Sequence, residues 1–359
     1  MAATDLEMVR VGEDDLKAFC TTVLRHVGMA PRQAATVIDN LVEADLRGVF
    51  SHGVVRFPIY VQRLEDGGTA VDPEMRVVRE TRTTAVLDGG NGMGQLVGKR
   101  AMEMAIEKAA DGDPAFVSVR NSNHYGAAAY YAEIASRADM IGLSFTIGGI
   151  NHMTPWGGAE AMLGNNPFAI AFPTDRAFPI VLDMACSVAA RGKIIVAAKD
   201  GTPIPADWAS GPDGQPTTDP VLALQGFVLP VGGPKGYALT LAVGLLSTML
   251  SDAYFGSEVT HMYEDTVTPQ NVGHLMGVLP IAAFEDVDRY KARMGKAIGD
   301  LAGVRKAPGV ERIYMPGERE HLARIAHRQG GIPLTPGVIA ELDEVGRRYG
   351  VALPRLDAA

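Results

Sequence analysis

The stretch TAVLDGGNGMGQLVGKRAMEMAIEKAA, residues 84–110, joins a short apolar run to a long amphipathic segment through a glycine-rich turn. Residues 84–88 have the composition of a β-strand, and residues 95–110 have the periodicity of a helix. The stretch therefore predicts the start of an α/β domain, in which a strand leads directly into a helix.

The glycine-rich turn invites comparison with the dinucleotide-binding turn of Rossmann domains, which has the spacing G-x-G-x-x-G. Gly92, Gly94 and Gly98 instead give G-x-G-x-x-x-G. The next predicted strand ends in Arg120 and Asn121 rather than in an acidic residue that could hold a ribose. A purely structural turn is therefore favoured here.

Outward from this stretch, the chain before residue 75 is predicted to be helical, and the chain after it alternates strands with helices. Helical periodicity covers residues 13–45, with Asp14 and Pro31 near helix starts. The apolar run 238–250 is too short to cross a bilayer and predicts a buried helix. Further strands are predicted at residues 75–78, 116–120, 141–146, 168–172 and 180–183, further helices at 126–136, 187–199, 235–251, 284–303 and 318–329, and a surface loop at 201–220.

The composition is that of a globular protein, with 47% hydrophobic and 21% charged residues among 359. A net charge of −9 argues against a nucleic-acid partner and against a basic membrane-surface protein. Cys20 and Cys186 are far apart and lack metal-ligand spacing, which indicates a reducing compartment. Residues 1–11 do not resemble a signal peptide, so we expect a cytoplasmic protein.

The segment FSHGVVR, residues 50–56, places an imidazole and a guanidinium four residues apart behind the helical segment. His52 can give or take a proton near neutral pH, and Arg56 can bind a carboxylate through two parallel hydrogen bonds. If the segment is helical, one turn separates the two side chains, so both can face one substrate. The pair suits chemistry on small acids, although on a helix surface it is more commonly a capping arrangement.

A second candidate lies in NSNHYG, residues 121–126, at the end of a predicted strand and just before a helix. Functional groups are often presented to a cleft from this position. His124 is therefore a candidate for proton transfer or substrate binding, although a histidine here is also commonly a hydrogen-bonded structural residue. The sequence does not show whether it meets His52 and Arg56.

Motifs further along the chain occur in a recognisable order. SHG and Arg56 are followed by NHYGAAAYYA, PWGG, LGNNP, LDMA, ARGK, GGPKGY and PGERE. In this order they resemble the malate/L-lactate dehydrogenase family of the second type, over residues 16–333. That family is distinct from the Rossmann-fold dehydrogenases of the same trivial name, and it includes ureidoglycolate and sulfolactate dehydrogenases, diketogulonate reductase and cyclic imino-acid reductases.

The resemblance implies an α/β, non-Rossmann NAD(P)-binding fold with a central mixed, largely antiparallel sheet flanked by helices. It also implies a homodimer that uses NAD or NADP on a small carboxylate substrate. We expect residues 1–75 with 300–359 to form a helical substrate and dimer domain, and residues 76–299 to form the α/β NAD(P)-binding domain.

The resemblance also assigns roles to single residues. His52 is implied to be the proton donor to a carbonyl or imine, and Arg56 to hold the substrate carboxylate. His124 is the proton acceptor of some members, and Ser51 is expected to orient the substrate or His52. Cofactor contacts are implied at Asp183, Met184, Ala185, Pro234, Lys235, Gly148, Gly317 and Glu318.

Two positions depart from the family pattern. Many members carry a serine in the loop where this chain has Gly148, so a cofactor contact there would have to come from backbone amides or from Thr146. Asn165 stands where a threonine is commoner, beside the implied cofactor site.

We therefore expect hydride transfer between a nicotinamide and the 2-carbon of a small 2-hydroxy or 2-oxo acid, with His52 moving the proton. The alternative is reduction of a cyclic or N-alkyl 2-imino acid by the same residues. The sequence decides neither the acid, nor NAD against NADP, nor the physiological direction.

Two rivals from other classes stay open. His52, His124 and His152 could form the open zinc site of a lyase or hydrolase, although no two of them have ligand spacing. The second rival is a binding protein without catalytic turnover. The presence of His52 and His124 argues against this hypothesis, because a protein that only binds needs no proton donor.

Overall fold

Strand β10 (Val272–Pro280) lies at the centre of the sheet around which the molecule is built. The computed structural model describes residues 8–355. The sheet has seven strands in the order β2-β3-β4-β10-β5-β6-β7, and β3 and β4 form its one parallel pair among the described residues. The predicted mixed, largely antiparallel sheet is therefore confirmed. The other strands are β2 (Arg76–Glu80), β3 (Thr84–Asp88), β4 (Ala115–Ser122), β5 (Met140–Thr146), β6 (Phe168–Phe172) and β7 (Ile180–Met184).

The sequence pattern does not predict β10, although β10 pairs with both β4 and β5. Gly273, His274 and Gly277 interrupt its apolar run. In the sheet these glycines make room for neighbours, because a Cβ atom at Gly277 would lie 2.5 Å from the Phe116 ring, and one at Gly273 would overlap the backbone of Ser247. Close packing on both faces therefore explains a composition that looks poor for a strand.

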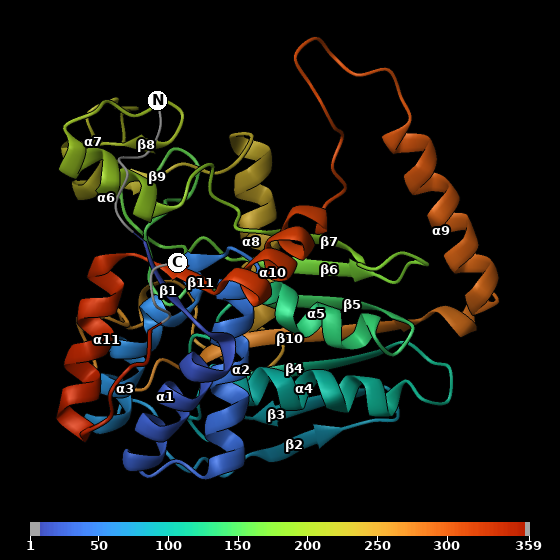
Figure 1. Cartoon of the computed structure of the whole chain (residues 1–359), viewed down its shortest axis with the longest axis horizontal. Helices are drawn as coiled ribbons and strands as arrows, with labels where there is room; N and C mark the ends of the chain where they lie inside the picture. The colour runs from blue at the N-terminus through green and yellow to red at the C-terminus, as the bar shows by residue number, and fades with distance from the viewer. Residues whose placement is uncertain (1–7, 356–359) are drawn as a thin grey trace.

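Helices cover both faces of the sheet (Figure 1). On one face, α4 (Gly94–Lys108) and α5 (Ala128–Ser136) form an apolar core with the strands. On the other face lies α8 (Pro234–Thr248), whose Val243 packs with Phe168 and Cys186. The glycine-rich turn before α4 is structural, because a Cβ atom at Gly94 would collide with the backbone of His124.

Helix α8 corrects the prediction of a buried helix over residues 238–250. Its sheet side is buried, but its other side leaves large apolar side chains exposed in the single chain. These exposed side chains, including those just beyond the helix end, are Leu239, Leu245, Leu246, Met249 and Leu250. No helix of the described residues is long and apolar enough to cross a membrane.

A second core joins the two ends of the chain (Figure 1). Strand β1 (Val9–Val11) pairs with β11 (Ile332–Leu334), and Leu16 and Leu41 share one buried cluster with Leu342, which lies about 300 residues further along the chain. The proposed domain boundaries stay a prediction, and their parts in residues 1–7 and 356–359 lie outside the described residues. The helices of this region are α1 (Glu13–His26), α2 (Pro31–Leu46), α3 (Phe57–Glu65), α10 (Glu318–Gly330) and α11 (Pro336–Tyr349).

A small satellite unit follows β7, with its own apolar cluster around Ile194 and Ala223. It contains α6 (Arg191–Asp200), which begins later than the predicted residue 187, and a mostly irregular 201–220 segment, as expected. The rest of the unit is β8 (Ala209–Ser210), α7 (Pro220–Gln225) and β9 (Phe227–Val228).

Helix α9 (Val287–Ala302) and the segment after it stand away from the body of the molecule (Figure 1). Arg176 anchors the helix to the body of the molecule by donating a hydrogen bond of 3.0 Å to the carbonyl of Gly295. Further along the chain, Leu301 and Val304 are exposed. The remaining short helices are the 3₁₀ turns η1 (Phe50–His52), η2 (Val54–Arg56), η3 (Gly256–Glu258) and η4 (Ile281–Ala283).

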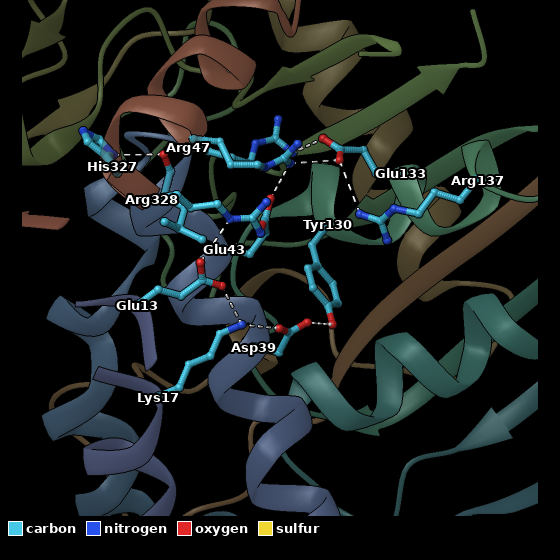
Figure 2. A network of polar contacts seen from close by, with 12 residues as sticks. Glu13, Lys17, Asp39, Glu43, Arg47, Tyr130, Glu133, Arg137, His327 and Arg328 are labelled. Atoms are coloured by element: carbon cyan, nitrogen blue, oxygen red, sulfur yellow. Dashed lines mark hydrogen bonds and ion pairs between the residues drawn. The ribbon is translucent and has the colours of Figure 1, made fainter. Parts of the chain in front are cut away.

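A network of charged side chains links α2, α5 and α10 (Figure 2). Arg47 pairs with Glu133, and both side chains are almost fully buried. Arg324 joins them by contacting Glu133 at 3.1 Å and by pairing with Glu43. Because removing one partner of a buried pair leaves an uncompensated charge, this network holds the three helices in one arrangement.

Candidate active site

The segment that carries His52 and Arg56 is two short 3₁₀ turns, η1 and η2, rather than the continuous helix under which one turn would separate them. Gly53 lies between the turns. Asp45, near the end of α2, accepts a hydrogen bond of 2.8 Å from the backbone N–H of Val54. The buried Asp45 carboxyl group therefore anchors the loop to the end of α2.

Despite this different geometry, Ser51, His52, Arg56 and His124 all line one cavity of about 160 Å³. The rings of His52 and His124 are stacked, with centroids 5.8 Å apart and planes at 25°. His52 comes from the segment after α2, and His124 follows β4. The fold therefore brings together four residues that the sequence could only nominate separately, while their roles stay predictions.

His124 is held in one tautomer by its neighbours. Its Nδ1 lies 2.6 Å from the hydroxyl of Tyr60 and accepts a hydrogen bond of 3.4 Å from the backbone N–H of Gly126. Since Nδ1 accepts, the proton of the neutral ring sits on Nε2. Burial, and then the neighbouring His52 and the positive charge of Arg56, lower the pKa of His124 well below its usual range. A neutral imidazole with a fixed Nε2–H is a hydrogen-bond donor.

His52 is also kept neutral. Its Nδ1 lies 2.9 Å from the hydroxyl of Ser51. Burial, and then the positive charge of Arg56, lower its pKa to about 4. At neutral pH the His52 ring is therefore unprotonated and can accept a proton. An anion bound to Arg56 would offset the positive charge of Arg56 and so raise the pKa of His52.

Arg56 is oriented by two contacts. Its Nε donates a hydrogen bond of 2.7 Å to the carbonyl of Ser51, and its guanidinium lies 5.6 Å from the centre of the Tyr263 ring. Within residues 8–355 its terminal nitrogens have no hydrogen-bond partner. They are available for the two oxygens of a carboxylate.

Several residues that build this site are not predicted by the sequence. Tyr60 on α3 fixes His124, and Asp45 supports the His52 loop. Arg63 binds the segment that carries Tyr263, because it donates to the carbonyls of Asp265 and Thr268. None of the three carries a motif, and only their burial in the fold reveals them.

Two further cavities adjoin the His52 cavity through shared lining residues, and we call these two cavities the groove. The first, of about 250 Å³, shares Ser51 and His52 with it and is also lined by Asp183, Met184 and Ala185. The second, of about 420 Å³, shares Asp183 with the first and is lined by Gly317. Gly148, by contrast, lines the His52 cavity itself.

Three of the predicted cofactor residues lie outside the lining of these cavities, and their contact with a cofactor stays a prediction. Glu318 is buried, pairs with Arg312 and accepts the backbone N–H of Met315 at 3.0 Å, so it has a structural part. Its neighbour Glu320 lines the groove instead. Pro234 and Lys235 line none of the three cavities; Gly232 and Gly233 before them line a separate cavity of about 620 Å³.

The histidines of the zinc hypothesis, His52, His124 and His152, all line the same cavity. Nevertheless, no group of three or more His, Cys, Asp or Glu side chains between residues 8 and 355 is arranged to hold a metal ion. The geometry gives no support to a zinc enzyme.

Comparison with known proteins agrees with this arrangement. The family model described as malate/L-lactate dehydrogenase matches residues 11–343. The malate dehydrogenase of Pyrococcus abyssi is 40% identical over 97% of both chains. The L-sulfolactate dehydrogenase of Methanocaldococcus jannaschii is 38% identical over 93% of this chain and 96% of the relative.

Solved structures give the same result. The malate dehydrogenase of Entamoeba histolytica matches with a TM-score of 0.91 and 34% identity, over 97% of this chain and all of that chain. The Δ1-piperideine-2-carboxylate reductase of Pseudomonas syringae matches with a TM-score of 0.81 and 27% identity, over 94% and 99% of the two chains. The chain therefore belongs to the malate/L-lactate dehydrogenase family of oxidoreductases.

Proposed function

We propose that the protein is an NAD(P)-dependent 2-hydroxy-acid dehydrogenase, which moves a hydride between a nicotinamide and the 2-carbon of a small 2-hydroxy or 2-oxo acid. One observation carries the proposal. The two neutral histidines, His52 and His124, line one cavity with Arg56, and this cavity shares Ser51 and His52 with the groove lined by Asp183. Proton transfer and carboxylate binding are the two tasks that such a reaction leaves to the protein.

The groove fits a nicotinamide dinucleotide. Its acidic side chains, Asp183 and Glu320, are suited to the hydroxyl groups of a ribose. Gly317, whose φ is +89°, lets the backbone approach closely, and Met184 and Ala185 line the middle section. When bound, the nicotinamide supplies or accepts the hydride. NAD and NADP both remain candidates for this groove.

The chain's own part in the mechanism follows from the charges. Arg56 binds the substrate carboxylate, and this anion offsets the positive charge that, next to burial, lowers the pKa of His52. His52 can then hold the proton that it gives to the substrate oxygen during reduction, or takes from the hydroxyl during oxidation. His124 donates its Nε2–H to the same oxygen and orients it. Ser51 contacts Nδ1 of His52 and sets the angle of the ring.

The alternative function is reduction of a cyclic or N-alkyl 2-imino acid. It is favoured by the likeness to the Δ1-piperideine-2-carboxylate reductase. Arg56 and His52 would act in the same way on a substrate with nitrogen in place of the reacting oxygen.

We further infer a homodimer and a cytoplasmic location. The exposed apolar side of α8, with Leu245 and Leu246, would be covered by a second copy of the chain. The exposed Leu301 of the projecting α9 is a second such feature. Cys20 and Cys186 are buried and free, as is usual in a reducing compartment.

The test is the initial rate of NADH and NADPH oxidation with pyruvate, oxaloacetate, sulfopyruvate, a 2-oxo acid with methylamine, and a cyclic imine. Turnover of a 2-oxo acid alone supports the dehydrogenase. Turnover only with the imine or the amine mixture supports the alternative. His52→Ala should leave cofactor binding intact and lower kcat by about 100-fold or more, which is the usual size of a general acid–base contribution. An unchanged kcat would remove His52 from the mechanism.

A further inference from the structure

A separate cavity, of about 310 Å³, borders the network of charged side chains that links α2, α5 and α10. Within residues 8–355 it shares no lining residue with the groove or with the His52 cavity. Its walls come from the end of α5, the turn between β6 and β7, α9 and α10. We call it the basic cavity, because its charged lining residues are four cations and two acids: Arg137, Arg176, Lys291, Arg324, Glu133 and Asp139.

The two acids of the basic cavity already have partners. Lys291 contacts Asp139 at 2.5 Å, and Glu133 is shared by three arginines, one of which lies outside the cavity. Arg176 contacts Asp175 at 3.4 Å, but this pair is half exposed and therefore weak. Four cations against two carboxylates leave the lining with a net charge of +2, in a chain whose net charge is −9. The basic cavity therefore favours an anion.

Phosphate is the anion that suits this lining best. Three of the four cations are arginines, and a guanidinium matches the geometry of a phosphate with two parallel hydrogen bonds. A phosphate monoester carries close to two negative charges at neutral pH. The buried Nε of Arg324 has no hydrogen-bond partner in the described part of the chain. The volume is at the lower end of the range of ~300–1,000 Å³ for small-molecule sites, so a phosphate with a short organic remainder fits.

The charged network connects the basic cavity to the groove. Figure 2 shows Glu133 between Arg47 and Arg137, and Arg47 lines the groove together with Asp183. Burial raises the pKa of Asp183 to about 6, and the charge of Arg47 opposes this rise. An anion that binds Arg137 and Arg324 would take them from Glu133. Glu133 would then depend on Arg47, whose charge would be less available to the groove.

We propose that the basic cavity binds the phosphate group of a small metabolite, and that this binding weakens the binding of the dinucleotide in the groove. The dinucleotide is itself an anion, so the two ligands compete for the same network of positive charge without touching each other. By linkage, the dinucleotide weakens phosphate binding by the same factor. The inference goes beyond the proposed function. Phosphate binding is measured without a cofactor, so it decides the site even if the proposed function fails.

The first test is calorimetry with inorganic phosphate and with glycerol 3-phosphate, at an ionic strength held constant with chloride. We expect Arg176→Gln and Lys291→Gln each to weaken binding by about 10-fold, as loss of a charged hydrogen bond does. Lys291→Gln leaves the anchor from Arg176 to α9 in place. Lys296→Gln on the same helix is the matched control, since Lys296 pairs with Asp300 and does not line the cavity. Tighter binding of glycerol 3-phosphate would identify a phosphate ester as the ligand, and equal binding would identify free phosphate.

The second test is the fluorescence titration of NADH at increasing phosphate concentrations. The dissociation constant for NADH should rise by about 5-fold and then level off, which is the lower end of typical coupling between two sites. The same rise should need about 10-fold more phosphate in Arg176→Gln. A rise that never levels off would place the phosphate in the groove and overturn the inference.

Three other results would also overturn the inference. One is phosphate binding no stronger than that of chloride, and another is a dissociation constant for NADH that phosphate leaves unchanged. The third is a loss of NADPH binding without a loss of NADH binding in Arg176→Gln. That result would assign the basic cavity to the 2′-phosphate of the cofactor.

Discussion

The carboxyl group of Asp45 occupies the space that a side chain at Gly53 would need, because a Cβ atom built at Gly53 would overlap it. The same carboxyl group accepts a hydrogen bond from the N–H of Val54. The loop that carries His52 therefore rests directly on the end of α2, with no room between them. The position of the His52 ring, which we propose to be catalytic, therefore depends on the absence of a Cβ atom at Gly53.

Replacing Gly53 should test this dependence. Gly53→Ala forces the loop away from Asp45, and overpacking of this kind costs about 1 to 3 kcal/mol. We expect a lower free energy of unfolding in urea and a lower kcat. Gly299→Ala in α9 is the matched control, since a Cβ atom there meets nothing within 4 Å. A Gly53→Ala enzyme with unchanged kcat would show that the loop need not rest on Asp45.

Asp45 should also make stability depend on pH. Burial raises its pKa to about 8, against about 4 in an unfolded chain. A carboxyl group whose pKa is raised by folding stabilises the protein below pH ~4, and this contribution is lost as the pH rises towards 8. Asp45→Asn removes the titration, so the wild type should lose stability relative to this variant between these pH values. Urea unfolding at several pH values measures the free energy of unfolding of both proteins. A constant difference between the two across this pH range would contradict the prediction.

The pH profile of the reaction should separate free from substrate-bound enzyme. The pKa of His52 is about 4 while Arg56 has no anion. A bound carboxylate offsets the charge of Arg56 and raises that pKa. The rate of oxidation at saturating substrate, which needs the neutral base, should therefore fall with acid at a higher pH than kcat/KM does. Coincident acid limbs in the two profiles would mean that Arg56 does not couple the anion to His52.

Tyr60 should matter through His124. Tyr60→Phe removes the hydroxyl at 2.6 Å from Nδ1 and leaves only the long contact of 3.4 Å from the Gly126 N–H to fix the tautomer of the ring. We expect kcat to fall by about 10-fold or more, with little change in KM, because transition-state proton contacts act mainly on kcat. Tyr130→Phe is the control, since its hydroxyl donates to Asp39 away from the cavity. Equal effects of the two substitutions would indicate a merely structural loss.

Leu246 should report on assembly. It is 41% exposed on α8, so Leu246→Lys places a charge on the surface that we expect a second copy to cover. Sedimentation should show a dimer for the wild type and a larger monomer fraction for the variant. Leu222→Lys on α7, where the leucine is 40% exposed, should remain dimeric. A monomeric wild type would end the proposal.

Much of the architecture was predictable because its elements carry strong local signals. The strands at residues 84–88 and 168–172 appear with the expected bounds. Strand β10 was not predictable from the sequence. Its Gly273 and Gly277 make room for Ser247 and Phe116, which pack against the strand only in the folded chain. Helix α8 was predicted as a helix, but the exposure of its apolar side was not. Whether that side is buried depends on the neighbouring elements and not on the sequence pattern of the helix.

The candidate site divides in the same way. Motifs nominated His52, Arg56 and His124, and the fold places them in one cavity. Motifs could not separate Glu318, which is paired with Arg312, from Glu320, which lines the groove. That difference depends on which side of a single helix turn faces the groove.

The pairing of β1 with β11 sets the order in which the protein can be completed during synthesis. Val9 and Val11 are synthesised before the strands of the sheet, whereas their partners Leu334 and Ile332 are synthesised after them. The strands of the sheet can pair while the chain is still growing. The core around the first helices can be completed only after β11 and α11 have been synthesised. His52 lies in the part that waits. A ribosome-bound chain that stops before β11 should therefore carry a formed groove wall and an unfinished proton-transfer site.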